Sequence, residues 1–385
     1  MRADAWRQGW PAVLLPGAVL TVAFGLRNAT HGANRGNDYE PVWRAGRTLF
    51  GSGRLYDTSA VTDPLNHPVF AYPPSSALIF SPLSALPFTA ARAVVAVLTV
   101  ASVVATLWVS ARLLRFPRES PVFLAACAAI VVTIPYYAMT YGGNAGAVVA
   151  LLTALMLLAW REQRWLASGG LFGLALAVKP MTIPLVLVFL LARQVKPLVL
   201  AGGVFLVLNG LALAVAGHLS QVGDWLRYLA KGTTLTGDLA VYSGSFRSFF
   251  DTHDLPHPLL LLTQLLMIVI GVRACWTAWH RQDAPEVRLV LSSGVLLLAA
   301  YLAGPLFEPT YLITLLPLVL LLARDDSPVR NAAVGAGLVL VLVAVDLGDV
   351  LGLPPTEVAQ ARLTLGASLW LMGLVRAAEA EPTAP

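Results

Sequence analysis

The stretch AARAVVAVLTVASVVATLWVSA, residues 90–111, decides the fold of this chain. It contains one charged side chain, Arg92, and is otherwise apolar apart from a few small hydroxyl residues. A helix that crosses a bilayer needs about 20 mostly apolar residues, because lipid offers its backbone no hydrogen-bond partners. Residues 90–111 are therefore predicted to form a membrane-spanning α-helix.

The rest of the chain has the same character. Of its 385 residues, 57% are hydrophobic and 12% are charged, and the mean hydropathy is +0.72. A soluble domain carries roughly 25% charged residues, so this chain is too apolar to cover a water-facing surface. A soluble enzyme, a disordered chain, a collagen-like chain and a nucleic-acid-binding array are excluded. We predict an all-α polytopic membrane protein.

Apolar segments of suitable length recur along the chain. The fifth and sixth are short and are separated by Lys179-Pro180, where proline removes a backbone donor and ends a helix. The first is interpreted as a retained helix, because no small-residue cleavage site follows it cleanly. The twelve predicted spans are residues 10–27, 90–111, 120–137, 144–160, 165–178, 181–192, 197–217, 257–279, 288–304, 309–323, 329–346 and 360–376.

Basic residues fix the predicted orientation, because cytoplasmic loops are enriched in Lys and Arg. With both termini in the cytoplasm, these loops also explain the net charge of +5 without a nucleic-acid partner. If residues 165–192 were one kinked helix, the later basic loops would lie outside, so twelve spans are favoured over eleven. The cytoplasmic connections hold Arg112, Arg115, Arg118, Arg161, Arg164, Arg193, Lys196, Arg281, Arg288, Arg324, Arg330 and Arg376.

Two connections within the single membrane domain, residues 28–89 and 218–256, are long and predicted to be extracytoplasmic. Residues 38–50 have helical spacing, and residues 75–86 are predicted to form a second helix or a re-entrant segment. The second loop carries an apolar stripe typical of an interfacial helix. The stripe consists of Val222, Trp225, Leu226 and Leu229.

Signals for a cofactor are absent from the sequence. Cys127 and Cys275 both lie in apolar runs, which argues against a disulfide framework or a zinc site. The six histidines show no metal-ligand spacing, and there is no P-loop, dinucleotide fingerprint or nucleophile elbow. We expect no cofactor and no dedicated metal site.

The acidic residues divide by predicted side. Those inside, such as Glu162 and Glu286, lie near arginines and are predicted to form solvated ion pairs. Those outside include Asp38 and Glu308 and accompany the two structured loops. An ionisable group next to lipid is costly and therefore marks a candidate site. The working site is predicted on the extracytoplasmic face.

Asp38 follows the first predicted span by about ten residues and opens the segment Asn37-Asp38-Tyr39-Glu40. One interpretation is a helix N-cap, a position that Asp suits. The other is a general base for a sugar hydroxyl at the membrane surface. Tyr39 and Glu40 belong to the same predicted substrate cavity.

Two basic residues are candidates for binding a phosphate. Lys179, at the Lys-Pro break, is either a lysine snorkelling to the interface or a point charge for a lipid-linked phosphate. Arg247 is either an ordinary loop arginine or a second phosphate ligand.

Further candidates for the cavity are polar or turn residues at the same face. Asn144 is a plausible N-cap, and the backbone amides around it could also face an anion. Glu308 is either a loop carboxylate or a cavity residue. The Tyr72-Pro73-Pro74 segment is either a structural turn or part of the cavity wall.

These pieces together resemble a known family. The stretches that carry the resemblance, in order after Asp38, are AGRTLFGSGRLYD (45–57), FAYPPSSALIFSPLSALP (70–87), GGNAGAVVALL (142–152) and GLALAVKPMTIPLVL (173–187). They resemble glycosyltransferase family 87, polytopic GT-C enzymes that use polyprenyl-phosphate sugars. The resemblance covers roughly residues 30–320, and the ordered set is more specific than any single stretch.

The resemblance implies roles for individual residues. Asp38 matches the catalytic aspartate of the first loop, Lys179 the Lys-Pro position near the donor phosphate, and Tyr72-Pro73-Pro74 the donor cavity. Family members invert the anomeric centre and work without an essential metal. Within the family, NDYEPVWRA (37–45) and SSGVLLL (292–298) are most similar to the actinobacterial branch that makes α-(1→3)-arabinofuranosyl branches.

The resemblance thus implies transfer of arabinofuranose from decaprenyl-phosphoryl arabinose to an arabinan acceptor of arabinogalactan or lipoarabinomannan, in the plasma membrane. An alternative is a polyprenyl-phosphate-mannose-dependent mannosyltransferase. The residues Gly304-Pro305-Leu306-Phe307-Glu308-Pro309-Thr310-Tyr311 lack the Trp- and His-containing segment of that branch. A transporter or flippase is disfavoured, because no long linker follows the sixth span. A non-catalytic scaffold is a third possibility. Partners are the sugar donor, the glycan acceptor and membrane lipids.

Overall fold

The computed structural model describes Ala23 and residues 38–51, 54–56, 70–116, 133–232, 243–305, 307–324, 327–342 and 355–380. These residues contain helices and no strand, as the all-α prediction requires. The elements are α2 (Glu40–Leu49), α3 (Pro74–Ser84), α4 (Phe88–Leu113), α6 (Ile134–Gly142), α7 (Gly146–Arg161), α8 (Trp165–Val178), η2 (Pro180–Leu185), α9 (Val186–Leu191), α10 (Val195–Ala216), α11 (Gln221–Gly232), α13 (Phe246–Thr252), α14 (His257–Arg281), α15 (Pro285–Ala303), η4 (Pro309–Leu315), α16 (Leu316–Leu321), α17 (Ala332–Leu342) and α19 (Pro355–Glu379).

Five of these helices, α4, α10, α14, α15 and α19, are long and apolar enough to cross a membrane. Shorter apolar helices lie in the predicted segments 144–160, 165–178, 181–192 and 309–323, and in the described part of 329–346. The first predicted span, 10–27, apart from Ala23, and most of the third, 120–137, lie outside the described residues. The multi-pass helical class is confirmed, while the count of twelve stays a prediction.

Helix α4 shows why the quoted stretch forms a span. It begins after Pro87 and ends at Leu113, close to the predicted 90–111. Its hydroxyl side chains bond within the helix, with Thr106 Oγ1 donating to Ser102 O at 2.7 Å and Ser110 Oγ donating to Thr106 O at 2.6 Å. A helix in lipid needs its polar groups satisfied in this way.

The chain reverses direction at Lys179. Helices α8 and α10 run side by side in the same direction, since Gly169 lies against Pro197 and Gly173 lies against Ala201. The segment between them, η2 and α9, must therefore return from the end of α8 to the start of α10. Residues 165–192 form two segments that run in opposite directions and not one kinked helix, as predicted.

Two short apolar segments share an unusual design. Each begins with a charged residue and a proline, continues as a 3₁₀ helix and ends as one short α-helix: Lys179-Pro180 starts η2–α9, and Glu308-Pro309 starts η4–α16. Both charged residues are extended, with φ −158 and ψ 116 at Lys179 and φ −84 and ψ 150 at Glu308. The residue before a proline is driven out of the helical region, so each charge stands where a helix is broken.

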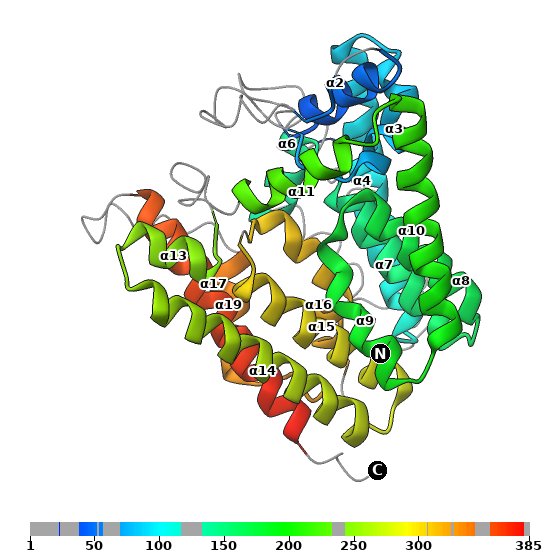
Figure 1. Cartoon of the computed structure of the whole chain (residues 1–385). Helices are drawn as coiled ribbons and strands as arrows, with labels where there is room; N and C mark the ends of the chain where they lie inside the picture. Colours follow the sequence, from blue (N-terminus) through cyan, green and yellow to red (C-terminus); the bar gives the residue numbers. More distant parts are fainter. Residues whose placement is uncertain are drawn as a thin grey trace.

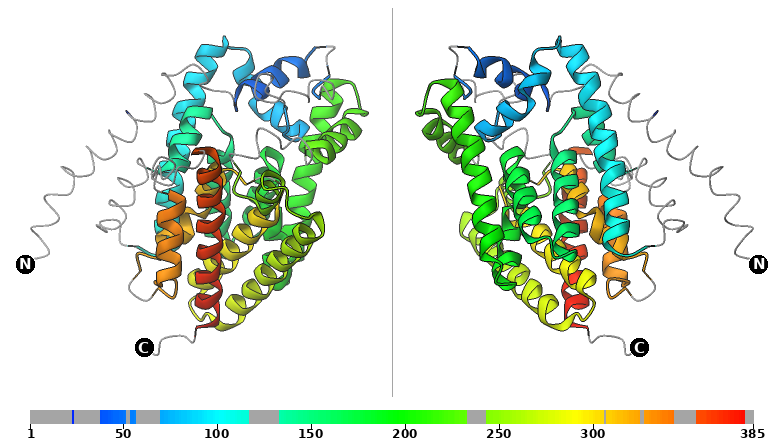
Figure 2. Two further views of the ribbon diagram at one scale, coloured as in Figure 1. Left: turned by 90° about the vertical axis from the view of Figure 1, so that its left-hand side faces the viewer. Right: turned by 90° about the vertical axis from the view of Figure 1, so that its right-hand side faces the viewer.

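The first long loop packs onto the bundle. The side chains that give residues 38–50 their helical spacing, Val42, Ala45 and Leu49, are buried in α2, and α3 begins at Pro74 as a second helix. Their side chains form a core with residues from the ends of α8 and α10. Figures 1 and 2 show α2, α3 and α11 together at one end of the bundle.

Helix α11 in the second loop has its polar side buried. Gln221 and Asp224 are buried, whereas Val222 and Leu226 of the predicted apolar stripe are exposed. Gln221 Oε1 accepts the backbone N–H of Leu55 at 3.0 Å, which ties α11 to the first loop. An interfacial position for the exposed stripe stays a prediction.

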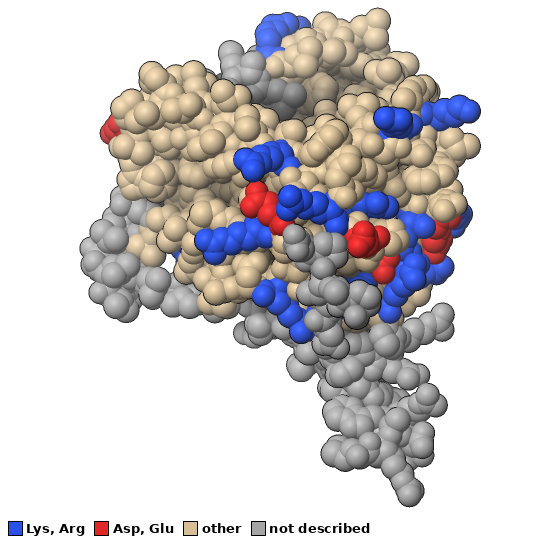
Figure 3. Space-filling view, turned by 90° about the horizontal axis from the view of Figure 1, so that it is seen from below, with Lys and Arg blue, Asp and Glu red and all other residues tan. Residues whose placement is uncertain are grey.

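Arginines gather at the other end of the bundle, seen from below in Figure 3. There Arg112 pairs with Glu162 at 2.8 Å. Glu286 is only 5% exposed and pairs with Arg324 at 3.1 Å. The prediction of solvated ion pairs at this face is thus wrong for Glu286, because the start of α15 packs inside the bundle. Which face is cytoplasmic stays a prediction.

Candidate functional site

Four of the predicted site residues meet at the end of the bundle that carries α2 and α3. Asp38 precedes α2, Asn144 precedes α7, Lys179 follows α8 and Glu308 precedes η4. Asn144 Nδ2 donates to Asp38 Oδ2 at 3.0 Å and to Glu308 Oε2 at 3.5 Å. Lys179 Nζ lies 3.9 Å from Glu308 Oε2. These residues are far apart in sequence and form one polar cluster, which we call the carboxylate–lysine site.

The glycines before α7 position Asp38. The carbonyl oxygen of Gly142 accepts the backbone N–H groups of Asp38 at 3.1 Å and Tyr39 at 3.2 Å. A Cβ atom at Gly142 would lie 2.8 Å from Asp38 Oδ2. Gly143, with φ +70, ends α6 in the left-handed conformation that glycine adopts readily. Glycine at 142 therefore allows the carboxylate to approach the backbone directly.

Asn144 combines the two roles that the sequence left open. Its Oδ1 accepts the backbone N–H of Gly146 at 2.8 Å, near the start of α7. This leaves its Nδ2 to face the two carboxylates, which accept hydrogen bonds and cannot donate them when charged. The helix start and the site thus fix one orientation of the amide.

Lys179 is held by neighbouring backbone and aromatic groups. Ser75 Oγ donates to the carbonyl oxygen of Ala177 at 2.6 Å, and Ser76 Oγ donates to that of Val178. These bonds satisfy carbonyls that the end of α8 leaves without helical partners. The ammonium group lies over the rings of Tyr72 at 5.4 Å and Tyr311 at 4.6 Å.

Glu308 is bound through one oxygen. Its Oε2 accepts from Thr310 Oγ1 at 3.0 Å, besides its contacts with Asn144 and Lys179. The backbone leading to Glu308 is held by buried residues of the second loop: Phe307 N donates to Ser243 Oγ at 2.9 Å, and Gly244 N donates to Phe307 O at 2.8 Å.

The surroundings of Asp38 raise the pKa of its carboxyl. Burial raises the pKa of the Asp38 carboxyl above its ordinary value, and the charge of Glu308 raises it further. The hydrogen bond from Asn144 and the charge of Lys179 act in the opposite direction. Burial, with smaller contributions from Asp38 and Glu308, also raises the pKa of Tyr72 well above its ordinary value. A buried carboxyl with a raised pKa is suited to accept a proton.

The remaining predicted cavity residues lie around this cluster in different ways. Pro73 and Pro74 are buried at the start of α3. The Tyr39 ring is buried and stacks on Phe88 at 6.4 Å. Glu40 pairs with Arg44 one turn along α2, at 2.9 Å from its Nε. The Tyr39 ring and the Glu40 carboxylate thus contact α4 and α2, and only the backbone N–H of Tyr39 reaches the cluster, at Gly142.

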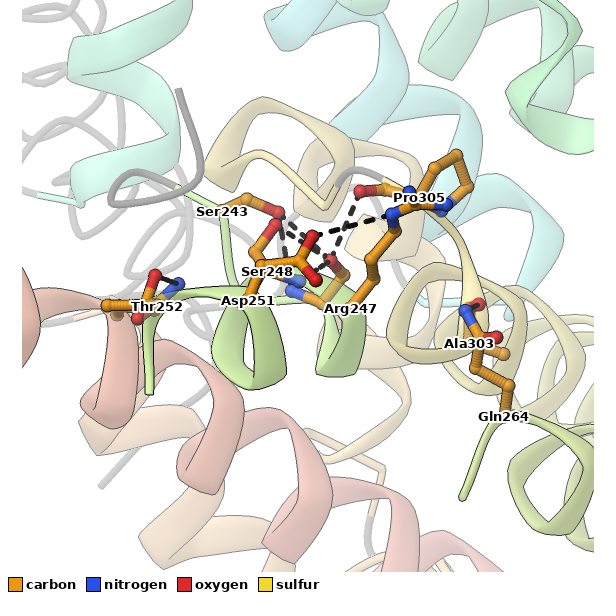
Figure 4. A network of polar contacts seen from close by, with 10 residues as sticks. Ser243, Arg247, Ser248, Asp251, Thr252, Gln264, Ala303 and Pro305 are labelled. Carbon is orange, nitrogen blue, oxygen red and sulfur yellow. Dashed lines mark hydrogen bonds and ion pairs between the residues drawn. The ribbon is translucent and has the colours of Figure 1, made fainter. Parts of the chain in front are cut away.

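Arg247 belongs to a second polar network, shown in Figure 4. Its Nε lies 3.5 Å from Asp251 Oδ2 on the next turn of α13. Ser245 Oγ caps α13 by accepting Ser248 N at 3.2 Å and donates to Pro305 O at 3.3 Å. The contacts recorded for Arg247 thus do not join it to Lys179, and the network instead supports the segment that leads to Glu308.

Sequence reasoning missed three residues of the cluster: Gly142, Thr310 and Tyr311. A signal for Thr310 was its position two residues after Glu308, across a proline, from which a hydroxyl can bond back. Tyr311 had no local signal, because its contact with Lys179 joins η4 to the end of α8. Within the described ranges, no three His, Cys, Asp or Glu side chains come together as a metal site requires. Independence from metal stays a prediction.

Two known proteins that share one name are similar in sequence to most of this chain. An alpha-(1->3)-arabinofuranosyltransferase of Mycobacterium tuberculosis is 28% identical over 326 residues, 83% of this chain and 73% of that protein. The protein of that name from Mycolicibacterium smegmatis is 27% identical over 331 residues, 83% of this chain and 74% of its own.

A third relative differs in its named sugar. It is a polyprenol-phosphate-mannose-dependent alpha-(1-2)-phosphatidylinositol pentamannoside mannosyltransferase of Mycobacterium tuberculosis, 29% identical over 274 residues, 68% of this chain and 59% of that protein.

The family model of glycosyltransferase family 87 matches residues 70–305, well over half of the 385 residues. The match includes Asn144 and Lys179 and ends just before Glu308. The chain belongs to glycosyltransferase family 87 and is a membrane glycosyltransferase.

Proposed function

We propose that this enzyme transfers arabinofuranose from decaprenyl-phosphoryl arabinose to an arabinan acceptor of the cell wall and forms an α-(1→3) branch. The observation that carries the proposal is the carboxylate–lysine site, in which Asn144 joins the buried Asp38 carboxyl to Glu308 and Glu308 pairs with Lys179. The names of the relatives at 28% and 27% identity supply the sugar.

In the proposed reaction, Asp38 removes the proton from the acceptor hydroxyl. The hydroxyl oxygen attacks the anomeric carbon, the bond from that carbon to the phosphate oxygen breaks, and polyprenyl phosphate leaves with the electron pair. A β-linked donor then gives an α-linked product. A positioned base typically contributes about 10²–10⁴-fold.

Lys179 is the proposed electrostatic partner of the leaving group. The phosphodiester of the donor carries one negative charge, and the departing phosphate gains a second. A fixed cation beside that phosphate stabilises the charge as it develops, and the exclusion of water strengthens the effect. Arg247 stays a proposed second ligand, reached only if the donor extends toward α13.

The site is proposed to face the outside of the cell, at the end opposite the arginine-rich face. Acceptor glycan would then enter across the two long loops, and the prenyl chain would lie between helices. Mannose is the alternative sugar, supported by the relative that is 29% identical over 274 residues.

The test is a transfer assay with purified protein. The protein is incubated with labelled polyprenyl-phosphoryl arabinofuranose and an oligoarabinoside, and in parallel with polyprenyl-phosphoryl mannose. Arabinose transfer with an α-(1→3) linkage in the product supports the proposal. Mannose transfer alone supports the alternative, and lipid transport without transfer supports a flippase.

A matched pair of lysine variants tests the phosphate site. Lys179→Gln removes the charge next to Glu308 and is expected to raise the KM for the donor at least about tenfold, because a phosphate contact in a dry site is lost. Lys196→Gln removes an exposed lysine at the start of α10 and is expected to leave the KM unchanged. An equal KM in both variants contradicts the role of Lys179.

A further inference from the structure

The ammonium group of Lys179 contacts the faces of two tyrosine rings. Its Nζ lies 4.6 Å from the centroid of the Tyr311 ring and 5.4 Å from that of the Tyr72 ring. Both distances are within the roughly 6 Å over which an aromatic ring attracts a cation. The rings come from distant parts of the chain, since Tyr72 precedes α3 and Tyr311 lies in η4. We call these two residues the tyrosine pair.

Each member of the tyrosine pair is held by buried aromatic neighbours. The Tyr311 ring contacts the buried rings of Tyr301 at 5.3 Å and Phe307 at 6.4 Å. On the other side of the sequence, the buried Tyr56 hydroxyl donates to the carbonyl oxygen of Tyr72 at 2.7 Å. The two rings are therefore fixed parts of the site, against which a flexible side chain can rest.

The hydrogen-bonding capacity of Lys179 is unused, although its side chain is only 14% exposed. An ammonium group has three N–H donors. Its contact with Glu308 Oε2, at 3.9 Å, is an ion pair that is longer than a hydrogen bond of about 3.2 Å or less. Among the residues that the structure describes, Lys179 Nζ makes no hydrogen bond. Glu308 Oε2 instead accepts from Thr310 and Asn144.

Aromatic rings hold a cation differently from a carboxylate. A carboxylate in direct contact with Lys179 would occupy its N–H donors and offset its charge, so an incoming phosphate would have to displace it. The face of a ring attracts the ammonium without taking its donors. Because the long side chain of a lysine is flexible, restricting it beforehand also lowers the entropy lost when a ligand binds.

We propose that the rings of Tyr72 and Tyr311 hold the Lys179 ammonium in place for the donor phosphate while leaving its N–H donors open. The inference rests on the proposed function in requiring a phosphate at Lys179. Both tyrosines act through Lys179 and are positioning residues. The ring is the part that acts, and the hydroxyl group is dispensable.

Binding of farnesyl phosphate to the full-length protein in nanodiscs tests the proposal. This probe carries the phosphate that arabinose and mannose donors share, so the result does not depend on the sugar. Farnesol, which lacks the phosphate, is the control probe. Dissociation constants are measured by calorimetry, and the wild type is expected to bind farnesyl phosphate more tightly than farnesol.

Variants of Tyr311 separate the ring from the hydroxyl. Tyr311→Leu is expected to raise the dissociation constant of farnesyl phosphate about three- to tenfold, because a cation–π contact in a largely buried site is lost. Its affinity for farnesol should not change. Tyr311→Phe keeps a ring that attracts cations, so its dissociation constant should stay within about twofold of the wild-type value.

A double-mutant cycle with Lys179→Gln separates positioning from a general structural role. In the Lys179→Gln background no ammonium remains, so Tyr311→Leu should weaken farnesyl phosphate binding no further. A purely structural effect would weaken binding in both backgrounds. Phe189→Leu is the matched control, since it removes a buried ring of α9 that stacks on Phe172; it should leave the dissociation constant unchanged.

The outcomes are distinguishable. Equal weakening by Tyr311→Phe and Tyr311→Leu assigns the effect to the hydroxyl and overturns the inference, as does an undiminished effect of Tyr311→Leu beside Lys179→Gln. Equal affinity of the wild type for farnesyl phosphate and farnesol overturns both the inference and the phosphate role of Lys179. Farnesyl phosphate binding as expected, without sugar transfer by the wild type, overturns the proposed function alone. If Tyr311→Leu does not fold, Tyr72→Leu in both backgrounds decides between the same outcomes.

Discussion

At the scale of single residues, the site depends on how closely a carboxylate approaches the backbone. Asp38 lies against Gly142, both through the bond of its N–H to the Gly142 carbonyl at 3.1 Å and through its side-chain oxygen. The residue types alone suggested an N-cap or a base for Asp38. The contacts with Gly142 and Asn144 favour the base, since the carboxylate faces the cluster.

Gly142→Ala is expected to lower kcat by about 10- to 100-fold, because small displacements of a reacting group are costly. The added Cβ would lie 2.8 Å from Asp38 Oδ2 and displace the carboxylate. The matched control is Gly170→Ala in α8, where nothing lies within 4 Å of the added atom. Transfer assays on both variants, with thermal unfolding in detergent, check the prediction. Equal activity of the two would contradict it.

Asp38→Asn is expected to reduce kcat by about 10²–10⁴-fold through loss of the base. Its effect on stability should become more favourable as pH rises above the ordinary pKa of an aspartate, 3.8. Because the pKa of Asp38 is raised in the folded protein, the folded state holds the proton more tightly than the unfolded chain. Stability contributed by that proton is lost as pH rises through the raised pKa.

Since Asn cannot ionise, Asp38→Asn avoids that loss. The Tm difference between Asp38→Asn and wild type should therefore grow from pH 5 to pH 8, as measured by thermal unfolding. For the wild type, kcat/KM should rise with pH through the same raised pKa. A Tm difference that does not change with pH would show that Asp38 is not destabilised by burial.

At the scale of elements, short and broken helices place the charges. Helix α8 has 14 residues, which span about 21 Å at 1.5 Å per residue, less than a hydrocarbon core of about 30 Å. If α8 starts at one membrane surface, we expect the lysine at its other end to lie within the thickness of the membrane. The serines of α3 close this end by bonding to its last carbonyls.

Ser76→Ala tests the hydrogen bond from α3 to the end of α8. Loss of its bond to the Val178 carbonyl is expected to cost about 1 kcal/mol of stability and to raise the donor KM, because the backbone next to Lys179 loosens. The control is Ser81→Ala in the same helix, whose hydroxyl bonds to Leu78 of its own helix at 2.7 Å. A change in KM of similar size in both variants would argue that the hydrogen bond from Ser76 to the Val178 carbonyl does not position Lys179.

At the scale of the whole molecule, the two ends of the bundle carry different sets of charged residues. One end carries the carboxylate–lysine site, and the other carries the buried pair of Glu286 with Arg324. Helix α7, with 16 residues, separates Asn144 from the arginine-rich end by about 24 Å. We therefore expect changes at the arginine-rich end to leave the carboxylate–lysine site unchanged.

Glu286→Gln is expected to destabilise the protein by about 3 kcal/mol, because Arg324 would keep its charge in a partly buried position without its carboxylate partner. The donor KM and kcat should not change, given the distance from the site. Glu162→Gln, which breaks the more exposed pair with Arg112, should cost less than about 1 kcal/mol. Thermal unfolding and transfer assays on both variants measure stability and activity separately. A fall in kcat for Glu286→Gln would show that the arginine-rich end affects the carboxylate–lysine site.

The sequence by itself determined the helical membrane class, the segment boundaries near 90–111 and 165–178, and the reversal at Lys179-Pro180. These follow from local causes: runs of apolar residues, the missing donor of proline and the placement of arginine. It also pointed to Asp38, Asn144, Lys179 and Glu308 one at a time.

Only the tertiary structure decided which of these candidates share a site. Asn144 joins Asp38 to Glu308, whereas Arg247 pairs with Asp251. It also decided that Glu286 is buried. The contacts of Asn144 with Asp38 and Glu308 join segments more than 100 residues apart, and hydropathy and spacing along the chain carry no information about such distances.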